Sequence, residues 1–350
     1  MAGRIRVLIV DDSALVRNIL SQGLSLDPGI EVVGTAADPY IARDLIVQLQ
    51  PDVMTLDVEM PRMDGVAFLR KLMPQYPIPI IMVSSLTQRG KQITMEALEA
   101  GAVDFVAKPT SNIAAGLSGM LAELRTKVRI ASTANVSHWK GRRPTAPRQR
   151  ASSAALPEST DKIIAIGAST GGTEAIREVI ETFPATTAGT VIVQHMPGGF
   201  TKMFADRLNQ LCQMQVKEAE HGDRVRAGLI LVAPGGKQFE IVRTGGFYEV
   251  KIGTDEKISG HCPSVDVMMH SIAKNVGSNA VGAMLTGMGQ DGAKGMLAMR
   301  QAGARCISQD EASSVVFGMP KVAYEKGGAE KLVPLNKIAA TLLSLLTEKK

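Results

Sequence analysis

Cysteine is scarce in this chain, and its distribution excludes a disulfide framework. The three cysteines are Cys212, Cys262 and Cys306, and no two of them form a C-x-x-C pair. Three scattered thiols cannot supply the bridges that hold a small secreted protein together, and they favour a reducing compartment. We therefore expect a cytoplasmic protein.

Long apolar runs are lacking as well. No uninterrupted stretch reaches the roughly 18 apolar residues that signal a membrane-spanning helix. The first apolar run, Val7–Val10, is far too short for a signal peptide and ends in two acids. We therefore expect that the protein is not embedded in a membrane.

Aromatic residues are also few, at 4%, whereas apolar residues make up 45% of the 350 residues. A chain this long exceeds one ordinary core and predicts two domains. The net charge of +5 comes largely from one segment rich in proline, serine and threonine, with basic residues at Lys140, Arg142, Arg143, Arg148 and Arg150. Such a composition indicates a solvated linker, so we expect no nucleic-acid partner.

Residues 4–125 alternate between strand-like and helical patterns. The strand-like runs are Val7–Val10, Glu31–Gly34, Val53–Leu56, Ile78–Val83 and Val103–Val106. The helical patterns between them include Ala14–Leu26, Ile41–Gln50, Val66–Leu72 and Ile93–Ala100. This alternation predicts a parallel, doubly wound α/β sheet of five strands in a flavodoxin-like order, with its site beyond the carboxyl ends of the strands.

Five polar residues follow strands of this predicted sheet. Asp11 and Asp12 follow the first strand, Asp57 the third, Ser84 the fourth and Lys108 the fifth. Three carboxylates at one edge repel one another unless a cation neutralises them, and Mg²⁺ suits an all-oxygen site that also binds phosphate. Asp57 is then the natural nucleophile for a phosphoryl group, while Lys108 pairs with the phosphate and Ser84 donates a hydrogen bond to it.

The motifs that contain these residues resemble a two-component receiver domain. They are Val10-Asp11-Asp12-Ser13, Leu56-Asp57-Val58-Glu59-Met60-Pro61-Arg62-Met63-Asp64-Gly65, Val83-Ser84-Ser85 and Lys108-Pro109. The resemblance implies that a histidine kinase phosphorylates Asp57 and that Ser84 and Phe105 move in the resulting switch. It also implies Mg²⁺ ligands at Asp11, Asp12, Asp57 and the backbone carbonyl of Glu59.

A second α/β pattern occupies residues 161–347, after a flexible basic linker at residues 126–160. Its strand-like runs begin at Lys162–Gly167 and recur at Thr190–Gln194, Leu229–Ala233, Ala280–Leu285 and Arg305–Ser308. Helical patterns cover Thr173–Thr182, Phe200–Leu211, Val265–Ile272 and Ala293–Ala302. Gln238–Arg243 and Tyr248–Ile252 predict a β-hairpin. We expect a doubly wound, mostly parallel sheet with this antiparallel insertion.

Three strand ends of this half carry a serine, a histidine and an aspartate. Ser169 lies in a Gly-x-Ser-x-Gly turn between a strand and a helix, which is typical of a nucleophile elbow but also of a phosphate cradle. His195 stands where a dinucleotide site needs an acid, and Asp291 ends a later strand. Each residue alone could cap a helix or be structural. Together they predict a Ser-His-Asp relay for acyl transfer, although the chain order differs from that of α/β-hydrolases.

The surrounding motifs resemble the chemotaxis methylesterase family, CheB. They are Ile164–Gly172, Gln194-His195-Met196, Pro263-Ser264-Val265-Asp266 and Thr286–Gly292. The order of receiver, linker and esterase also matches. No role is assigned to His261 and His270, which lie near Cys262 in a spacing that fits no ordinary zinc site.

The resemblance implies a phosphorylation-activated hydrolase without a cofactor for the esterase chemistry. It removes methyl groups from glutamyl γ-methyl esters on the cytoplasmic helices of methyl-accepting chemoreceptors, releasing methanol, and deamidates receptor glutamines. Backbone N–H groups of Met288 and Thr170 are its candidate oxyanion donors. We expect a shallow substrate groove beside Ser169, lined by the helix of Met268 and Met269.

Two other functions stay open at this point. One is a response regulator whose second half binds a nucleotide without catalysis, because a glycine-rich turn precedes a helix. The other is a DNA-binding response regulator that uses the basic linker, although no helix-turn-helix pattern occurs.

Overall fold

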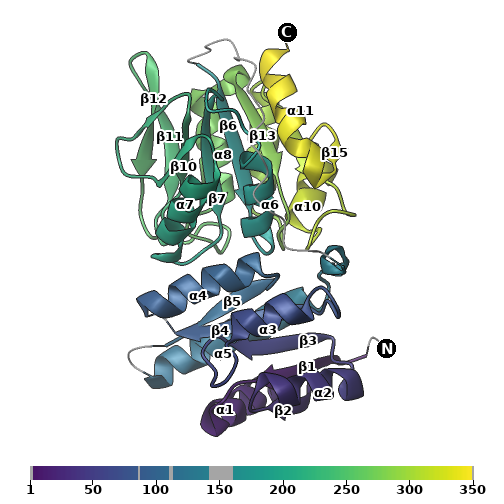
Figure 1. The fold of residues 1–350 in the computed structure, drawn as a ribbon. Helices are drawn as coiled ribbons and strands as arrows, with labels where there is room; N and C mark the ends of the chain where they lie inside the picture. Colours follow the sequence, from purple (N-terminus) through teal and green to yellow (C-terminus); the bar gives the residue numbers. More distant parts are fainter. Residues whose placement is uncertain (1–2, 86, 110–112, 142–160, 349–350) are drawn as a thin grey trace. The chain divides into compact units, whose positions relative to one another are not determined.

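The computed structural model describes residues 3–85, 87–109, 113–141 and 161–348. Its contacts divide the chain into two compact units, Met1–Arg148 and Gln149–Lys350. Both units are α/β folds built on a parallel sheet (Figure 1). Among the described residues, no helix combines the length and the apolar character needed to cross a membrane.

The sheet of the first unit has five parallel strands in the order β2-β1-β3-β4-β5, as the sequence predicts. The strands are β1 (Ile5–Val10), β2 (Ile30–Ala36), β3 (Val53–Asp57), β4 (Ile80–Ser85) and β5 (Asp104–Lys108). Strand β3 is buried along its whole length, and so are most residues of β1 and β4. Continuous burial explains why these strands are apolar runs rather than alternating patterns.

Five helices cover this sheet: α1 (Ala14–Ser25), α2 (Pro39–Leu49), α3 (Gly65–Leu72), α4 (Gln88–Glu99) and α5 (Ile113–Ala131). Helix α1 packs on α5, and α3 packs on α4. Helix α4 begins five residues before the predicted Ile93. Thr87 is the reason, because its hydroxyl accepts a hydrogen bond from the Gly90 N–H at 3.0 Å and caps the helix there.

The predicted boundary at residue 125 falls inside helix α5, which continues to Ala131. A short 3-10 turn, η1 (Ser137–Trp139), follows, and its Trp139 ring lies against Gly101, where a Cβ would come within 3.0 Å of the indole. The first part of the predicted linker therefore packs on the receiver unit. Residues 142–160, the rest of that linker, lie outside the described residues.

The second unit has seven parallel strands in the order β15-β14-β13-β6-β7-β10-β8. They are β6 (Ile163–Ala168), β7 (Gly189–Gln194), β8 (Gln215–Glu218), β10 (Leu229–Val232), β13 (Ala280–Met284), β14 (Arg305–Gln309) and β15 (Leu332–Val333). The chain builds the sheet outward from β6 in one direction and from β13 in the other. The topology therefore reverses between β6 and β13, and such a reversal opens a crevice at the carboxyl ends of the two strands.

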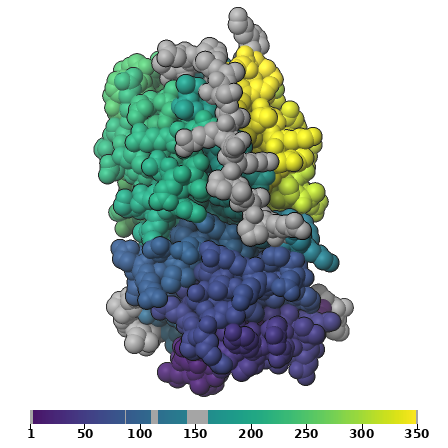
Figure 2. Space-filling model, viewed as in Figure 1, coloured from purple at the N-terminus to yellow at the C-terminus, as the bar shows by residue number. Residues whose placement is uncertain are grey.

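The helices of this unit are α6 (Gly172–Ile180), α7 (Phe200–Leu211), α8 (Val265–Asn275), η2 (Gly277–Asn279), α9 (Ala293–Gln301), α10 (Met319–Glu325) and α11 (Leu335–Thr347). Helix α6 packs on α11, whereas α8, α9 and α10 pack in succession. Helix α11 lies on the surface in Figure 2 (yellow), with Ile338 and Leu342 turned into the core.

A separate antiparallel sheet contains β9 (Arg224–Val225), β11 (Phe239–Thr244) and β12 (Phe247–Ile252), in the order β11-β12-β9. The hairpin of β11 and β12 confirms the predicted insertion. Strand β11 packs on helix α8, which is held between this sheet and helix α9. Met268 and Met269 of α8 are both 0% exposed, so these two side chains do not line a substrate groove, and a groove beside helix α8 stays a prediction.

Candidate phospho-acceptor and catalytic sites

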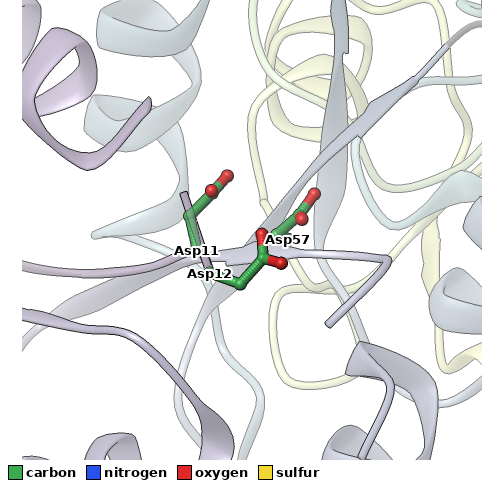
Figure 3. A group of neighbouring side chains, drawn as sticks. All are labelled: Asp11, Asp12 and Asp57. Atoms are coloured by element: carbon green, nitrogen blue, oxygen red, sulfur yellow. The ribbon is translucent and has the colours of Figure 1, made fainter. Parts of the chain in front are cut away.

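Three carboxylates converge at the carboxyl edge of the first sheet. Asp11, Asp12 and Asp57 each offer one carboxylate oxygen, and these three atoms lie within 4.8 Å of one another; Figure 3 shows the three side chains. Asp11 and Asp57 are buried, whereas Asp12 is exposed. The Lys108 ammonium donates to Asp11 Oδ2 at 3.0 Å and to Asp57 Oδ1 at 2.8 Å. The exposed Glu59 follows strand β3 by two residues. The structure thus brings the predicted acids and the lysine together.

The electrostatics of this edge leave Asp57 poorly satisfied as an anion. Burial raises the pKa of Asp57 to about 6; the charge and hydrogen bond of Lys108 oppose this shift, and the neighbouring charge of Asp11 adds to it. Burial alone would lower the pKa of Lys108, but the charge of Asp57 and its hydrogen bond raise it, so this lysine stays protonated. One ammonium facing three carboxylates leaves negative charge uncompensated. The residues present therefore fit a hard divalent cation.

The two predicted switch residues both lie inside the first unit. Ser84 is 0% exposed, and its Oγ lies 2.6 Å from Thr94 Oγ1 and 3.2 Å from the Gly90 carbonyl oxygen of helix α4. Its hydroxyl is thus engaged with α4 and not with the carboxylates. Phe105 is buried on β5, with the Lys127 ammonium 5.2 Å from its ring centroid.

The predicted serine, histidine and aspartate follow β6, β7 and β13, which are neighbours at the reversal of the second sheet. Ala168 pairs with Gln194 in register, so Ser169 and His195 leave adjacent strands at the same level. The Ser169 N–H donates to the Thr286 carbonyl at 3.0 Å across the crevice. The chain then turns sharply through Gly171, whose φ of +76° favours glycine, into helix α6.

The histidine and the aspartate form a direct pair. His195 Nε2 lies 2.8 Å from Asp291 Oδ2. A carboxylate only accepts hydrogen bonds, so Nε2 is the protonated nitrogen of the neutral ring and Nδ1 is the basic one. Among the described residues, Nδ1 is buried without a hydrogen-bond partner. Ser169 is half-buried, and its hydroxyl makes no hydrogen bond to this nitrogen.

Asp291 is anchored by the N-terminus of helix α8. Its Oδ1 accepts from the Ser264 hydroxyl at 2.7 Å and from the Asp266 N–H at 3.2 Å, and its Oδ2 accepts from the Val265 N–H at 2.7 Å. Burial by itself would raise the pKa of Asp291. The hydrogen bond and charge of His195, together with the bonds from Ser264 and Val265, outweigh burial and lower the pKa. Asp291 is therefore an anion held rigidly against the imidazole.

Comparisons with known proteins agree with this geometry. Residues 164–342 match the model of the CheB methylesterase and residues 7–115 that of the response regulator receiver domain. The chain is 67% identical over 352 residues, covering both proteins completely, to the protein-glutamate methylesterase/protein-glutamine glutaminase of Syntrophotalea carbinolica. The protein of that name from Sulfurimonas denitrificans is 56% identical over 99% of each chain. The chain belongs to the CheB methylesterase family.

A solved structure of the CheB family supports the fold of the second unit. The crystal structure of the Thermotoga maritima CheB methylesterase catalytic domain is 37% identical, with a TM-score of 0.52, and the match covers 53% of this chain and all of that domain. Membership in the CheB methylesterase family gives no support to an output domain that binds a nucleotide without catalysis.

The loop after β13 carries the predicted oxyanion donor of this CheB family member. Met288 is 46% exposed, and within the described part of the chain its N–H donates to no backbone carbonyl. Thr170, the other candidate, is buried, and its carbonyl accepts from the Thr286 hydroxyl at 3.0 Å. Gly287 allows the loop to approach Ser169, because a Cβ there would lie 2.8 Å from Ser169 Cβ. Met288 is thus the better placed candidate, and the oxyanion role of both residues stays a prediction.

Two residues of the site escaped the sequence analysis. Gln194 is buried, and its Nε2 donates to the carbonyls of Ser169 at 2.9 Å and of His195 at 3.2 Å, so one side chain connects the backbones of these two residues. His261 stacks on His195 with ring centroids 3.7 Å apart and an interplanar angle of 6°. In the sequence, only the position of Gln194 directly before His195 indicates that Gln194 belongs to the site. His261 has none, because its loop lies far from the three strand ends in sequence.

Proposed function

We propose that this chain hydrolyses glutamyl γ-methyl esters of methyl-accepting chemoreceptors, deamidates receptor glutamines, and is activated when a histidine kinase supplies a phosphoryl group to Asp57. Its full-length relatives carry the name of both activities. The observation that carries the proposal is the pair of His195 and Asp291 beside Ser169 at the reversal of the sheet. Such a site performs acyl transfer and needs no metal for it.

The ester reaction follows from the roles of the three side chains. Ser169 Oγ attacks the γ-carbonyl carbon while His195 Nδ1 takes the hydroxyl proton. Asp291 stabilises the resulting imidazolium through Nε2, and backbone N–H groups such as that of Met288 stabilise the oxyanion. The C–O bond then breaks, and the imidazolium gives its proton to the departing methoxide. An acyl-enzyme and methanol result.

Water completes the cycle through the same residues. His195 Nδ1 removes a proton from the water as its oxygen attacks the acyl-enzyme carbonyl. The proton then returns to Ser169 Oγ as the acyl bond breaks, and glutamate is released. A γ-amide follows the same path with ammonia as the product of the first half. Because an amide nitrogen leaves less readily than methoxide, deamidation depends more on protonation by His195.

The acidic edge of the first unit supports the regulatory half of the proposal. Asp11, Asp12 and Asp57, with the backbone carbonyl of Glu59, would hold Mg²⁺ there. Bound Mg²⁺ would neutralise the carboxylates and the oxygens of the incoming phosphoryl group. Asp57 would accept that group through a carboxylate oxygen, and Lys108 would then pair with the phosphate instead of with the free carboxylate. The cytoplasmic location stays a prediction.

Methanol release tests the proposal directly. The full chain is mixed with a methylated cytoplasmic fragment of a chemoreceptor, with and without acetyl phosphate and Mg²⁺. We expect release that rises with acetyl phosphate and disappears in Ser169→Ala. Asp57→Asn should keep the basal rate and lose the stimulation. Release that persists in Ser169→Ala would overturn the proposed chemistry, and an Asp57→Asn enzyme that still responds would overturn the proposed regulation.

A further inference from the structure

A second histidine lies directly on the ring of the relay histidine. The His261 ring is nearly parallel to that of His195, at 6° and a centroid distance of 3.7 Å. Asp291 holds the edge of the His195 ring at Nε2. A bond at one edge leaves the ring free to swing about that contact, whereas a flat neighbour on its face restricts this motion. Edge and face together define the plane of the imidazole.

The backbone that presents His261 is fixed by several independent bonds. Ile258 and His261 exchange two backbone hydrogen bonds, at 2.9 and 3.0 Å, around a tight turn. The turn residue Ser259 has a φ of +54°, and its hydroxyl lies 3.4 Å from Asp266 Oδ2 on helix α8. Gln238 Nε2 donates to the His261 carbonyl at 3.1 Å. The same Gln238 accepts through Oε1 from the Ser264 N–H at 3.0 Å, so one buried amide connects this turn to the helix N-terminus that holds Asp291.

The charge state of His261 suits a stacking partner. Burial, together with the charge of His195, lowers the pKa of His261 to about 4. The other charged groups that act on His261 are Asp291, which opposes this shift, and Lys257, which supports it. The ring is therefore neutral near pH 7. A neutral His261 ring does not repel the imidazolium of His195, whereas a protonated His261 ring would.

We propose that His261 is a positioning residue of the esterase reaction, whose ring fixes the plane of the His195 imidazole and shields one face of it from water. This inference rests on the proposed function, because it assigns a role in that reaction. A fixed plane keeps the basic Nδ1 directed to one place, where the Ser169 hydroxyl can deliver its proton. Misplacement of a reacting group by about 1 Å costs up to about a hundredfold in rate.

Kinetics of two variants separate stacking from mere folding. His261→Ala removes the ring and should lower kcat for methanol release by about tenfold or more, with KM changed less than about twofold. His261→Phe restores a flat ring without nitrogen atoms and should recover most of the lost rate. An unchanged kcat in His261→Ala, or equal losses in both variants, would overturn the proposal.

A measurement without turnover distinguishes failure of this inference from failure of the proposed function. NMR relaxation of the His195 ring in the full chain, assigned through His195→Gln, should show greater ring mobility in His261→Ala than in the parent and in His261→Phe. His270→Ala is the matched control, since His270 is exposed on helix α8, and it should leave the ring mobility and kcat unchanged. Identical mobility of the His195 ring in all four proteins would refute the fixing of its plane even if no methanol were released.

Discussion

Replacing Asp291 by asparagine tests the relay most directly, because the change removes one charge and keeps the shape. The carboxylate accepts four hydrogen bonds, two at each oxygen. An asparagine NH₂ in place of Oδ2 would oppose the Val265 N–H and force His195 to accept through Nε2. In place of Oδ1 it opposes the Asp266 N–H, which is farther away at 3.2 Å, but it also meets the Ser264 hydroxyl, which can rotate and accept. The orientation with NH₂ in place of Oδ1 is therefore preferred, and His195 keeps its proton on Nε2.

The expected decrease in kcat then comes from the missing charge of Asp291 alone. An ion pair of imidazolium and carboxylate at about 4 Å is worth about 4 kcal/mol at the effective dielectric constant of about 20 that suits protein sites. Because about 1.4 kcal/mol corresponds to a factor of ten, Asp291→Asn should lower kcat by about a thousandfold. A wrong tautomer of the histidine would lower kcat by about another factor of ten, as in Ser-His-Asp enzymes whose asparagine variant presents its NH₂ group to the histidine. KM should change little, since Asp291 is 2% exposed.

Single-turnover release of methanol from a methylated receptor fragment measures this loss, with acetyl phosphate and Mg²⁺ present throughout. Ser264→Ala is the informative companion variant. It removes the only acceptor that lets the asparagine amide adopt the preferred orientation, so the double variant should fall below Asp291→Asn by about another tenfold. A loss of less than tenfold in a folded Asp291→Asn would refute the assignment of Asp291 to the relay. An unchanged rate on adding Ser264→Ala would refute the argument about orientation.

Three further perturbations test other parts of the molecule. With a chelator present, Asp57→Asn should raise the melting temperature by a few degrees at pH 7 and leave it unchanged near pH 4. Burial raises the pKa of Asp57 to about 6, so the folded chain binds this proton more tightly than the unfolded chain does. The free energy of unfolding therefore falls by up to about 3 kcal/mol as the pH rises from about 4 to above 6. Thr94→Val removes the hydroxyl bonded to Ser84 and should lower the acetyl phosphate concentration for half-maximal activation about fivefold. Gly287→Ala places a Cβ 2.8 Å from Ser169 Cβ and should lower kcat at least about tenfold.

Each of these three has a control within the chain. Mg²⁺ should raise the melting temperature of the parent and not that of Asp57→Asn, and equal pH profiles of the two would contradict the buried charge. Thr94→Ser keeps the hydroxyl and should activate like the parent. If Thr94→Val does the same, the bond to Ser84 does not restrain the switch. Gly246→Ala adds a Cβ in open space on the hairpin and should retain full activity. Full activity in Gly287→Ala would contradict this reasoning, because the loop would then accommodate the added Cβ without displacing Ser169.

The parts of the fold that the sequence predicted are those in which local pattern and topology agree. Buried parallel strands are apolar runs, and their carboxyl ends carry the polar residues, so the order of β1, β3, β4 and β5 and the meeting of Asp57 with Lys108 could be expected. The same logic placed Ser169, His195 and Asp291 at one crevice. Short edge strands such as β8 and β15 escaped prediction, because Gln215–Glu218 and Leu332–Val333 carry too few apolar residues to form a pattern.

The details that decide the chemistry depend on contacts between distant segments, and no local pattern encodes them. His261 lies 66 residues after His195, and its ring reaches the relay only because Gln238 and Asp266 fix the intervening turn. The use of Nε2 rather than Nδ1 for Asp291 depends on where helix α8 begins, because its first residues hold the carboxylate. The burial of Met269 depends on the packing of β11 on one side of that helix and α9 on the other. Amphipathic spacing shows that a helix has an apolar face but not that both faces are covered.

Asp57 and Asp291 show how one residue type at equivalent places serves two purposes. Both carboxylates are buried at the carboxyl end of a parallel sheet, yet the pKa of Asp57 is raised and that of Asp291 is lowered. The difference lies in their partners. Asp291 accepts bonds from a hydroxyl, two backbone N–H groups and an imidazole, so its charge is fully satisfied and it stays in place as an orienting group. Asp57 shares one ammonium with Asp11, and its surplus charge favours the arrival of a cation and makes its oxygen available to phosphorus.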